Sequence, residues 1–338
     1  MKKFRIIDWY IIALFAVSIA VITLRSYALF SFFNDATKYF DNKTAITVGN
    51  LLVIFSVIAF TSYILLGDKE SDLIARTDNA ATYIPTGLVC TAMIFMAVER
   101  FRFYATEQTG SARSLSLISG ILALLSVVSF FVSIFLDKGH RSYKAAFSLC
   151  TVFFLIAYAL FIYFNKNGHP INSQNKIVDQ MAYLFSGAFF LYESRIHMGR
   201  AQWRPYISFG LCATLICLYS SVPSIILFLV NGTTVSDGMI ESVLTLTLAI
   251  FIASRVIQWK TLTPNAECSA AKSISTLAAM REEEIEEQRK IARAHDNNNV
   301  EKEETEDSSN YTFDIPYITP DTDFNPDGAD IDITGGQY

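Results

Sequence analysis

Eight apolar stretches, each long enough to cross a lipid bilayer, fill the chain between residues 8 and 260. A helix needs about 20 mostly apolar residues to span the hydrocarbon core of a membrane. Short polar connections separate the stretches, so neighbouring helices are expected to run antiparallel. The sequence therefore predicts an all-α, polytopic integral membrane protein with about eight transmembrane helices, at residues 9–30, 45–66, 83–104, 115–136, 142–164, 178–198, 205–230 and 239–259.

The distribution of charge divides the chain into a membrane part and a tail. Residues 1–263 contain 21 Lys and Arg against 14 Asp and Glu, whereas residues 264–338 contain 6 against 18. Within the second part, residues 264–295 have the composition of a charged helix, and residues 296–338 have the polar, acidic composition of a disordered segment. We expect a transmembrane bundle over 1–263, a charged cytoplasmic helix over 264–295 and a disordered acidic tail over 296–338.

The flanking basic residues predict the orientation of the bundle. With the N-terminus inside, 13 Lys and Arg residues flank the inner side and 8 flank the outer side. This bias favours cytoplasmic N- and C-termini. Short loops and the lack of a eukaryotic targeting signal favour a bacterial plasma membrane. The lipid bilayer is then one partner, and the acidic tail argues against binding to nucleic acid.

Small residues recur at spacings of three and four in two of the expected helices. The stripe in 115–136 contains Ser116, Ser119, Ala123, Ser126, Ser129 and Ser133, and the stripe in 205–230 contains Gly210, Ala213, Cys217, Ser221 and Ser224. Small side chains let helix backbones approach closely in a membrane. We expect these stripes to pack helices rather than to line a ligand site.

Charged residues inside or at the edge of a span are costly in hydrocarbon, so each is a candidate functional residue. The predicted topology places them at two levels. The outer set, a candidate pocket for a small ligand or ion, contains Arg25, Glu99, Arg100, Arg102, Asp179 and Glu241. The inner charged cluster contains Glu193, Arg195 and Arg255. The alternative is that these residues reach the lipid headgroups or form structural ion pairs.

Other chemical signals are weak. Pro223 falls deep within the seventh expected span and predicts a helix kink, because proline lacks the amide hydrogen that the helix needs. Neither the five Cys nor the four His residues have metal-binding spacing, and no catalytic motif is present. The sequence predicts no metal and no cofactor, and a membrane enzyme is the third function considered, after the two given below.

The tail contains one segment that differs from its acidic surroundings. Aromatic and β-branched residues alternate with polar ones over 311–320, and they include Tyr311, Phe313, Ile315, Tyr317 and Ile318. Such a segment can add a strand to a sheet of a partner protein or fill aromatic pockets, so it is a candidate docking segment. The alternative is a solubilising extension.

Two functions follow from these features. The first is a membrane sensor or scaffold whose cytoplasmic tail docks a partner, and it rests on the charge asymmetry and the segment 311–320. The second is a small-solute or ion transporter that uses the charged residues of the spans and the proline of the seventh. A water-filled path to the outer set would favour transport, whereas a tightly packed bundle would favour the scaffold.

Overall fold

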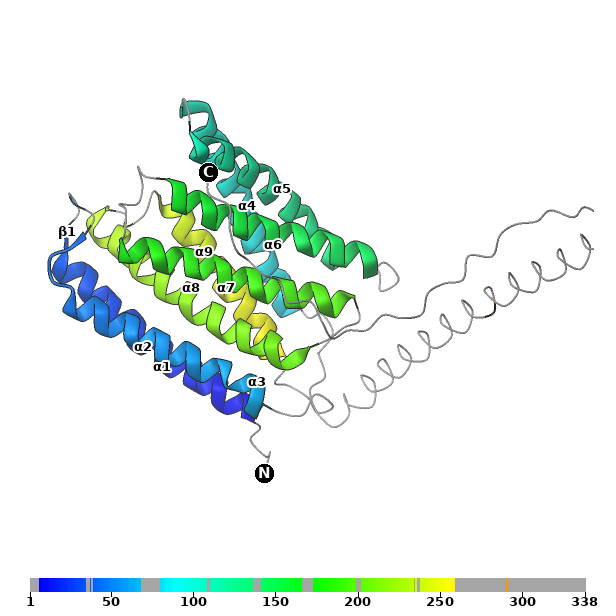
Figure 1. Ribbon diagram of the computed structural model, residues 1–338, viewed down its shortest axis with the longest axis horizontal. Coiled ribbons are helices and arrows are strands. Elements are labelled where there is room, and N and C mark those ends of the chain that lie inside the picture. The colour runs from blue at the N-terminus through cyan, green and yellow to red at the C-terminus, as the bar shows by residue number, and fades with distance from the viewer. Residues whose placement is uncertain are drawn as a thin grey trace, which may run out of the picture. The chain divides into compact units, whose positions relative to one another are not determined.

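Helices account for nearly all of the chain that the computed structural model describes, which comprises residues 6–34, 37, 39–67, 80–107, 110–135, 141–165, 173–198, 202–233, 235, 238–258 and 290 (Figure 1). In order, they are α1 (Ile6–Phe32), α2 (Thr44–Thr61), α3 (Tyr63–Leu66), α4 (Ala80–Thr106), α5 (Ser111–Phe135), α6 (Arg141–Phe164), α7 (Gln174–His197), α8 (Trp203–Asn231) and α9 (Met239–Gln258). Two short antiparallel strands, β1 (Phe33–Asn34) and β2 (Tyr39–Phe40), connect α1 to α2.

The described helices confirm the predicted fold class, an all-α polytopic membrane protein. Seven spans are long and apolar enough to cross a membrane, and α2 and α3 together form one of them, Thr44–Leu66. The break at Ser62 between α2 and α3 was not expected within the predicted span 45–66. The remaining long helix, α7, lies at the predicted position 178–198 but begins earlier and is more polar than the seven.

Helix α7 has its polar side chains inside the bundle and its apolar side chains outside. Its buried polar residues include Asn175, Lys176, Asp179, Ser186, Glu193 and Ser194. Its exposed large apolar residues form a strip along the helix, and they are Ile177, Met181, Leu184 and Leu191. A helix that turns apolar side chains outward and pairs its polar ones inward is suited to lipid. This arrangement supports the prediction of an eighth span.

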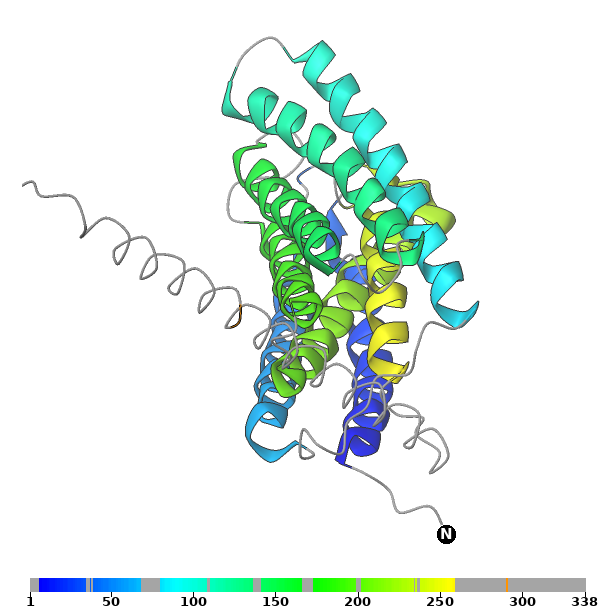
Figure 2. The same ribbon diagram turned by 90° about the vertical axis from the view of Figure 1, so that its right-hand side faces the viewer.

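Six helices close into a ring. Each of α4 to α8 packs against the next helix in the chain, and α9 packs back against α4. The turned view shows α9 (yellow) between α8 and α4 (Figure 2). The hairpin of α1 and α2 lies outside the ring and packs on α8. Helix α8 is therefore the common support of both parts, because it contacts α1, α2, α3, α7 and α9.

The small-residue stripes lie where helices meet, as predicted. All five members of the α8 stripe are buried, as are five of the six in α5; the Ser133 side chain lies outside the described part. A methyl group added at Gly210 of α8 would come within 2.5 Å of Val256 Cγ2 and 3.2 Å of the Phe189 ring. Gly210 thus lets α7 and α9 approach α8 closely.

Side chains of α6 and α7 join these helices through main-chain carbonyl groups. Near one end, Lys176 Nζ donates to the Tyr163 carbonyl at 2.8 Å, and Gln180 Nε2 donates to the Ala159 carbonyl at 3.3 Å. Near the other end, the Ser194 hydroxyl donates to the Ala145 carbonyl at 3.1 Å. These bonds satisfy polar groups that would otherwise face hydrocarbon.

The strands β1 and β2 cap the hairpin of α1 and α2. Phe33 pairs with Phe40, and their rings meet edge to face at 5.5 Å. Phe40 is buried in a small apolar cluster with Leu29, Ile46 and Leu227, separate from the main core. This cluster fixes the end of the hairpin against α8.

The predicted tail lies outside the described residues, apart from Lys290. This holds for the charged helix 264–295, for the acidic segment 296–338 and for the docking residues Tyr311, Phe313, Ile315, Tyr317 and Ile318. The division of the chain at residue 263 and the docking segment therefore stay predictions.

Candidate functional site

Arg25 of α1 turns into the bundle, toward α7 and α8. Its side chain is 1% exposed, and Nη2 donates to Asn175 Oδ1 of α7 at 3.0 Å. The guanidinium carbon lies 4.5 Å from the ring centroid of Tyr219 on α8. The Tyr219 hydroxyl in turn donates to Asn50 Oδ1 of α2 at 2.8 Å. One arginine and its partners thus connect the outer hairpin to two helices of the ring.

Arg100 of α4 is also buried, and aromatic rings surround its guanidinium group. The guanidinium carbon lies 4.3 Å from the ring centroid of Phe161, 5.5 Å from that of Tyr158 and 5.7 Å from that of Phe103. Such distances allow cation–π attraction, which strengthens when the cation is shielded from water. Among the described residues, Nε and Nη1 of Arg100 have no hydrogen-bond partner.

Two carboxylates lie near a buried tyrosine between these arginines. Asp179 of α7 accepts a short hydrogen bond from the Ser220 hydroxyl of α8. The Tyr183 hydroxyl of α7 shares a 3.1 Å hydrogen bond with the Thr245 hydroxyl of α9. Tyr183 lies within electrostatic reach of both Asp179 and Glu241. Both carboxylates therefore act electrostatically on the same tyrosine hydroxyl.

These contacts form one continuous series across the bundle. The ring of Tyr183 meets the ring of Tyr158 edge to face at 4.7 Å, which links the carboxylates to the surroundings of Arg100. Ser220 and Tyr219 are consecutive residues of α8, so the contacts of Asp179 and of Arg25 lie at the same level of that helix. We call this series the buried polar chain; its members are Arg25, Asn175, Tyr219, Ser220, Asp179, Tyr183, Thr245, Glu241, Tyr158 and Arg100.

The buried polar chain contains four of the six residues of the predicted outer set. The other two lie apart from it: Glu99 is half-buried, and Arg102 is exposed. No hydrogen bond or ring contact of the described residues joins either of them to the chain. The alternative prediction was that these residues reach the lipid headgroups or form structural pairs; Arg25 and Arg100 point into the bundle, where a structural role stays open.

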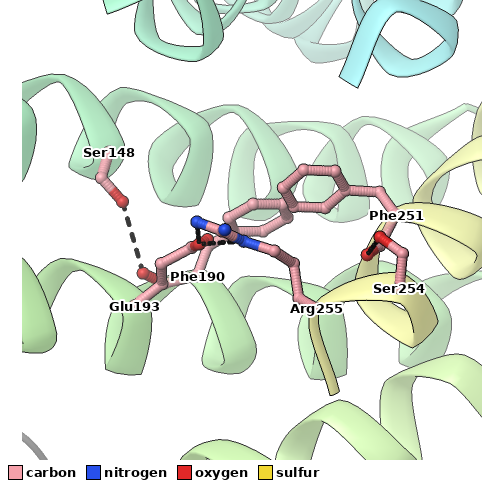
Figure 3. Close-up of polar contacts among 6 residues, drawn as sticks. All are labelled: Ser148, Phe190, Glu193, Phe251, Ser254 and Arg255. Atoms are coloured by element: carbon pink, nitrogen blue, oxygen red, sulfur yellow. Dashed lines mark hydrogen bonds and ion pairs between the residues drawn. The ribbon is translucent and has the colours of Figure 1, made fainter. Parts of the chain in front are cut away.

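The inner charged cluster contains one ion pair between helices (Figure 3). Nε and Nη2 of Arg255 on α9 donate to Glu193 Oε1 on α7 at 3.0 and 2.8 Å. The rings of Phe190 and Phe251 stack beside this pair, with centroids 5.7 Å apart. Ion pairing between the two spans was feasible from the sequence, and these two residues form it.

Arg195 does not join that pair. It is exposed, and its Nη1 donates to Gln202 Oε1 at 2.9 Å. Two residues along a helix correspond to a rotation of about 200°, so Arg195 and Glu193 face opposite sides of α7. Arg195 therefore contributes to the inner surface rather than to the packed interior.

The predicted kink at Pro223 falls within a continuous helix. Helix α8 runs through Pro223 from Trp203 to Asn231, and Pro223 is buried. The hydroxyl groups of Ser221 and Ser224 donate to the carbonyl groups four residues earlier, at 2.7 and 2.9 Å. The kink itself stays a prediction.

Metal binding is not indicated in the described part of the chain. There, no three His, Cys, Asp or Glu side chains come together in a way that could hold a metal ion. The chemistry of the buried polar chain is instead that of hydrogen bonds, opposite charges and aromatic rings.

Sequence reasoning missed the uncharged members of the buried polar chain, above all Tyr158 and Tyr183. It also missed Asn175, although a signal was available. Asn175, Lys176, Asp179 and Gln180 recur with helical spacing at the start of α7, which places several polar groups on neighbouring positions of one helix. In a span, such a group indicates a side that is turned away from lipid.

Comparison with protein families, with curated proteins and with solved structures returned no match. The fold therefore defines the class of this protein, a multi-pass helical membrane protein with a polar chain inside its bundle.

Proposed function

We propose that this protein is a membrane sensor or scaffold whose cytoplasmic tail docks a partner under the control of the helical bundle. The observation that carries the proposal is a double connection between α7 and α9. One contact is the Tyr183–Thr245 hydrogen bond within the buried polar chain, and the other is the Glu193–Arg255 ion pair. Helix α9 is the last element before the tail, so a change in α9 would be passed on to it.

The two contacts have the same spacing on both helices. Ten residues separate Tyr183 from Glu193, and ten separate Thr245 from Arg255, so α7 and α9 run in the same direction. At 1.5 Å per residue, the contacts lie about 15 Å apart along each helix. A ligand that disturbed the first contact would act on a helix pair held together at the second, which is the arrangement that a sensor needs.

The composition of the tail supports the second part of the proposal, the docking of a partner. Residues 264–338 are strongly acidic, and an anionic inner leaflet would repel them. Within that region, the alternating segment 311–320 has the composition of a peptide that adds to the edge of a partner's sheet. In the proposed orientation, this segment is presented to the cytoplasm.

The experiment is a capture of cytoplasmic proteins with the full-length protein in its native membrane. The comparison protein has residues 311–320 scrambled, and a third version carries Glu193→Gln. We expect a partner that is lost on scrambling and whose capture changes when the ion pair is removed. Capture that is equal with all three versions would contradict the proposal.

Transport is the second candidate, because charges of both signs lie inside the bundle. Arg25, Arg100, Asp179 and Glu241 are each at most 6% exposed. Charged groups in the interior of a span mark ion and proton paths in many transporters. Proteoliposomes with an enclosed pH dye test this alternative: an imposed gradient would drive a proton flux that Asp179→Asn abolishes. A flux equal to that of empty vesicles would rule out proton transport.

A further inference from the structure

The guanidinium group of Arg100 is buried, and two of its nitrogen atoms find no acceptor in the part of the chain that the structure describes. The residue is 6% exposed, and neither Nε nor Nη1 has a hydrogen-bond partner among the described residues. Buried arginines are usually paired, because an unpaired charge in a medium of low dielectric constant is costly. The rings of Phe161, Tyr158 and Phe103 offset part of that cost, but they accept no conventional hydrogen bond.

Contact with lipid headgroups does not explain the position of Arg100. Two residues further along α4, Arg102 is exposed and reaches the surface of the bundle. Arg100 lies instead against Phe161 of α6, inside the ring of helices. Its two open donors therefore indicate a place for an anionic group that enters the bundle.

The neighbouring charges limit what that anion can be. Tyr158, which lies over Arg100, contacts Tyr183, and Tyr183 interacts electrostatically with Asp179 and Glu241. Two nearby carboxylates repel a doubly charged anion such as phosphate more strongly than a singly charged one. The aromatic rings around Arg100 favour a ligand whose body is apolar or flat.

We propose that Arg100 anchors a site for a small organic monocarboxylate. The carboxylate accepts hydrogen bonds from the guanidinium group, and the apolar body of the ligand lies against the rings of Phe103 and Phe161. This inference names a ligand class for the buried polar chain, and so it rests on the proposed sensing function. Nε and Nη1 of Arg25 also have no hydrogen-bond partner among the described residues, but Nη2 of Arg25 already donates to Asn175, which makes Arg25 the poorer candidate.

The test measures binding of radiolabelled benzoate to the full-length protein in nanodiscs of phosphatidylcholine. Benzoate combines a single carboxylate with a flat apolar body. We expect saturable binding at one site, competition by unlabelled isovalerate, and no competition by inorganic phosphate or by benzyl alcohol. Absence of saturable binding, or competition by phosphate at equal strength, would overturn the proposal.

Matched variants locate the site. Arg100→Lys keeps the charge but loses the planar pair of donors, so benzoate should bind at least about tenfold more weakly. Arg102→Lys is the control on the same helix and should bind as the wild type does. Phe161→Leu should also weaken benzoate binding. If Arg100→Lys fails to fold, this variant tests the location of the site in its place. Equal binding by wild type and Phe161→Leu would contradict the assigned site.

Failure of this inference can be told apart from failure of the proposed function. Benzoate binding that leaves the capture of a tail partner unchanged would keep the site and contradict sensing. A tail partner that responds to Glu193→Gln in a protein that binds no benzoate would keep the sensor and overturn the ligand class.

Discussion

Glu193 and Arg255 join α7 to α9 through a single carboxylate oxygen, which accepts from both Nε and Nη2 of the guanidinium group. The side chains are 8% and 20% exposed, so little water competes for these bonds. The pair lies beside the stacked rings of Phe190 and Phe251. It is therefore a structural contact of the bundle as well as a candidate element of signalling.

Removal of this charge should destabilise the bundle. Glu193→Gln removes the charged acceptor of two hydrogen bonds from Arg255, and we expect a loss of about 1–3 kcal/mol in the free energy of unfolding. Thermal or denaturant unfolding of the purified protein in detergent measures it. Arg195→Gln is the control, since Arg195 is exposed and makes a surface hydrogen bond to Gln202 and a cation–π contact with Tyr192 rather than a buried ion pair. Equal losses of unfolding free energy in both variants would show that the buried ion pair contributes no more to stability than the surface contacts of Arg195.

Gly210 should tolerate no larger residue. In Gly210→Ala, the new methyl group would meet Val256 Cγ2 at 2.5 Å, and we expect a loss of about 1–3 kcal/mol. Adding Val256→Ala to the Gly210→Ala protein should restore part of the lost stability, because it removes the Cγ2 atom that the new methyl group meets. Gly187→Ala is the matched control on α7, because its nearest neighbour, Leu155 Cβ, lies at 3.8 Å. A stable Gly210→Ala protein would contradict the close packing of α8 with α9.

The hydrogen bond to Asp179 should matter more than other serine contacts of α8. Ser220→Ala removes a donor from a buried carboxylate, for which we expect a loss of about 1–3 kcal/mol. Ser224→Ala removes only a bond to the carbonyl group four residues earlier in its own helix, and its effect should be smaller. The measurement is the free energy of unfolding of the two variants under the same conditions. A larger loss for Ser224→Ala than for Ser220→Ala would contradict the prediction.

The crossing of the membrane by α7 can be tested with single cysteines and a membrane-impermeant maleimide on intact cells. Thr37→Cys and Asn231→Cys, both exposed, should react from outside. Met198→Cys, 54% exposed at the other end of α7, should react only after permeabilisation. If α7 did not cross, Met198→Cys would react from outside and Asn231→Cys would not. The wild type serves as the blank, since its described cysteines are largely buried.

The sequence predicted the helices well because apolar length is a local property. The seventh expected span, 205–230, corresponds to α8 at Trp203–Asn231, and the fifth, 142–164, corresponds to α6 at Arg141–Phe164. The position of helix α7 was also predicted, even though its buried polar residues lower its apolar content. The strands β1 and β2 were not expected, because two-residue strands leave no periodic signal.

The site was predicted only in part, because partners depend on how each helix is rotated about its axis. Charge alone identified Arg25, Arg100 and Asp179 as candidates. Hydropathy does not reveal that Arg25 meets Asn175, which is 150 residues away in the chain. The separation of Arg195 from Glu193 was within reach of sequence reasoning, since two residues on a helix point to opposite sides.

The equal spacing of the two contacts between α7 and α9 limits how these helices can move. Sliding of α9 along α7 would stretch both contacts by the same amount, so it would strain the ion pair and the hydroxyl contact together. Tilting would open one contact while the other served as a pivot. A charge-assisted bond is stronger than one between two hydroxyl groups, so the pivot should be the Glu193–Arg255 pair. We therefore expect α9 to swing about its C-terminal end, where Arg255 lies, rather than to slide along α7.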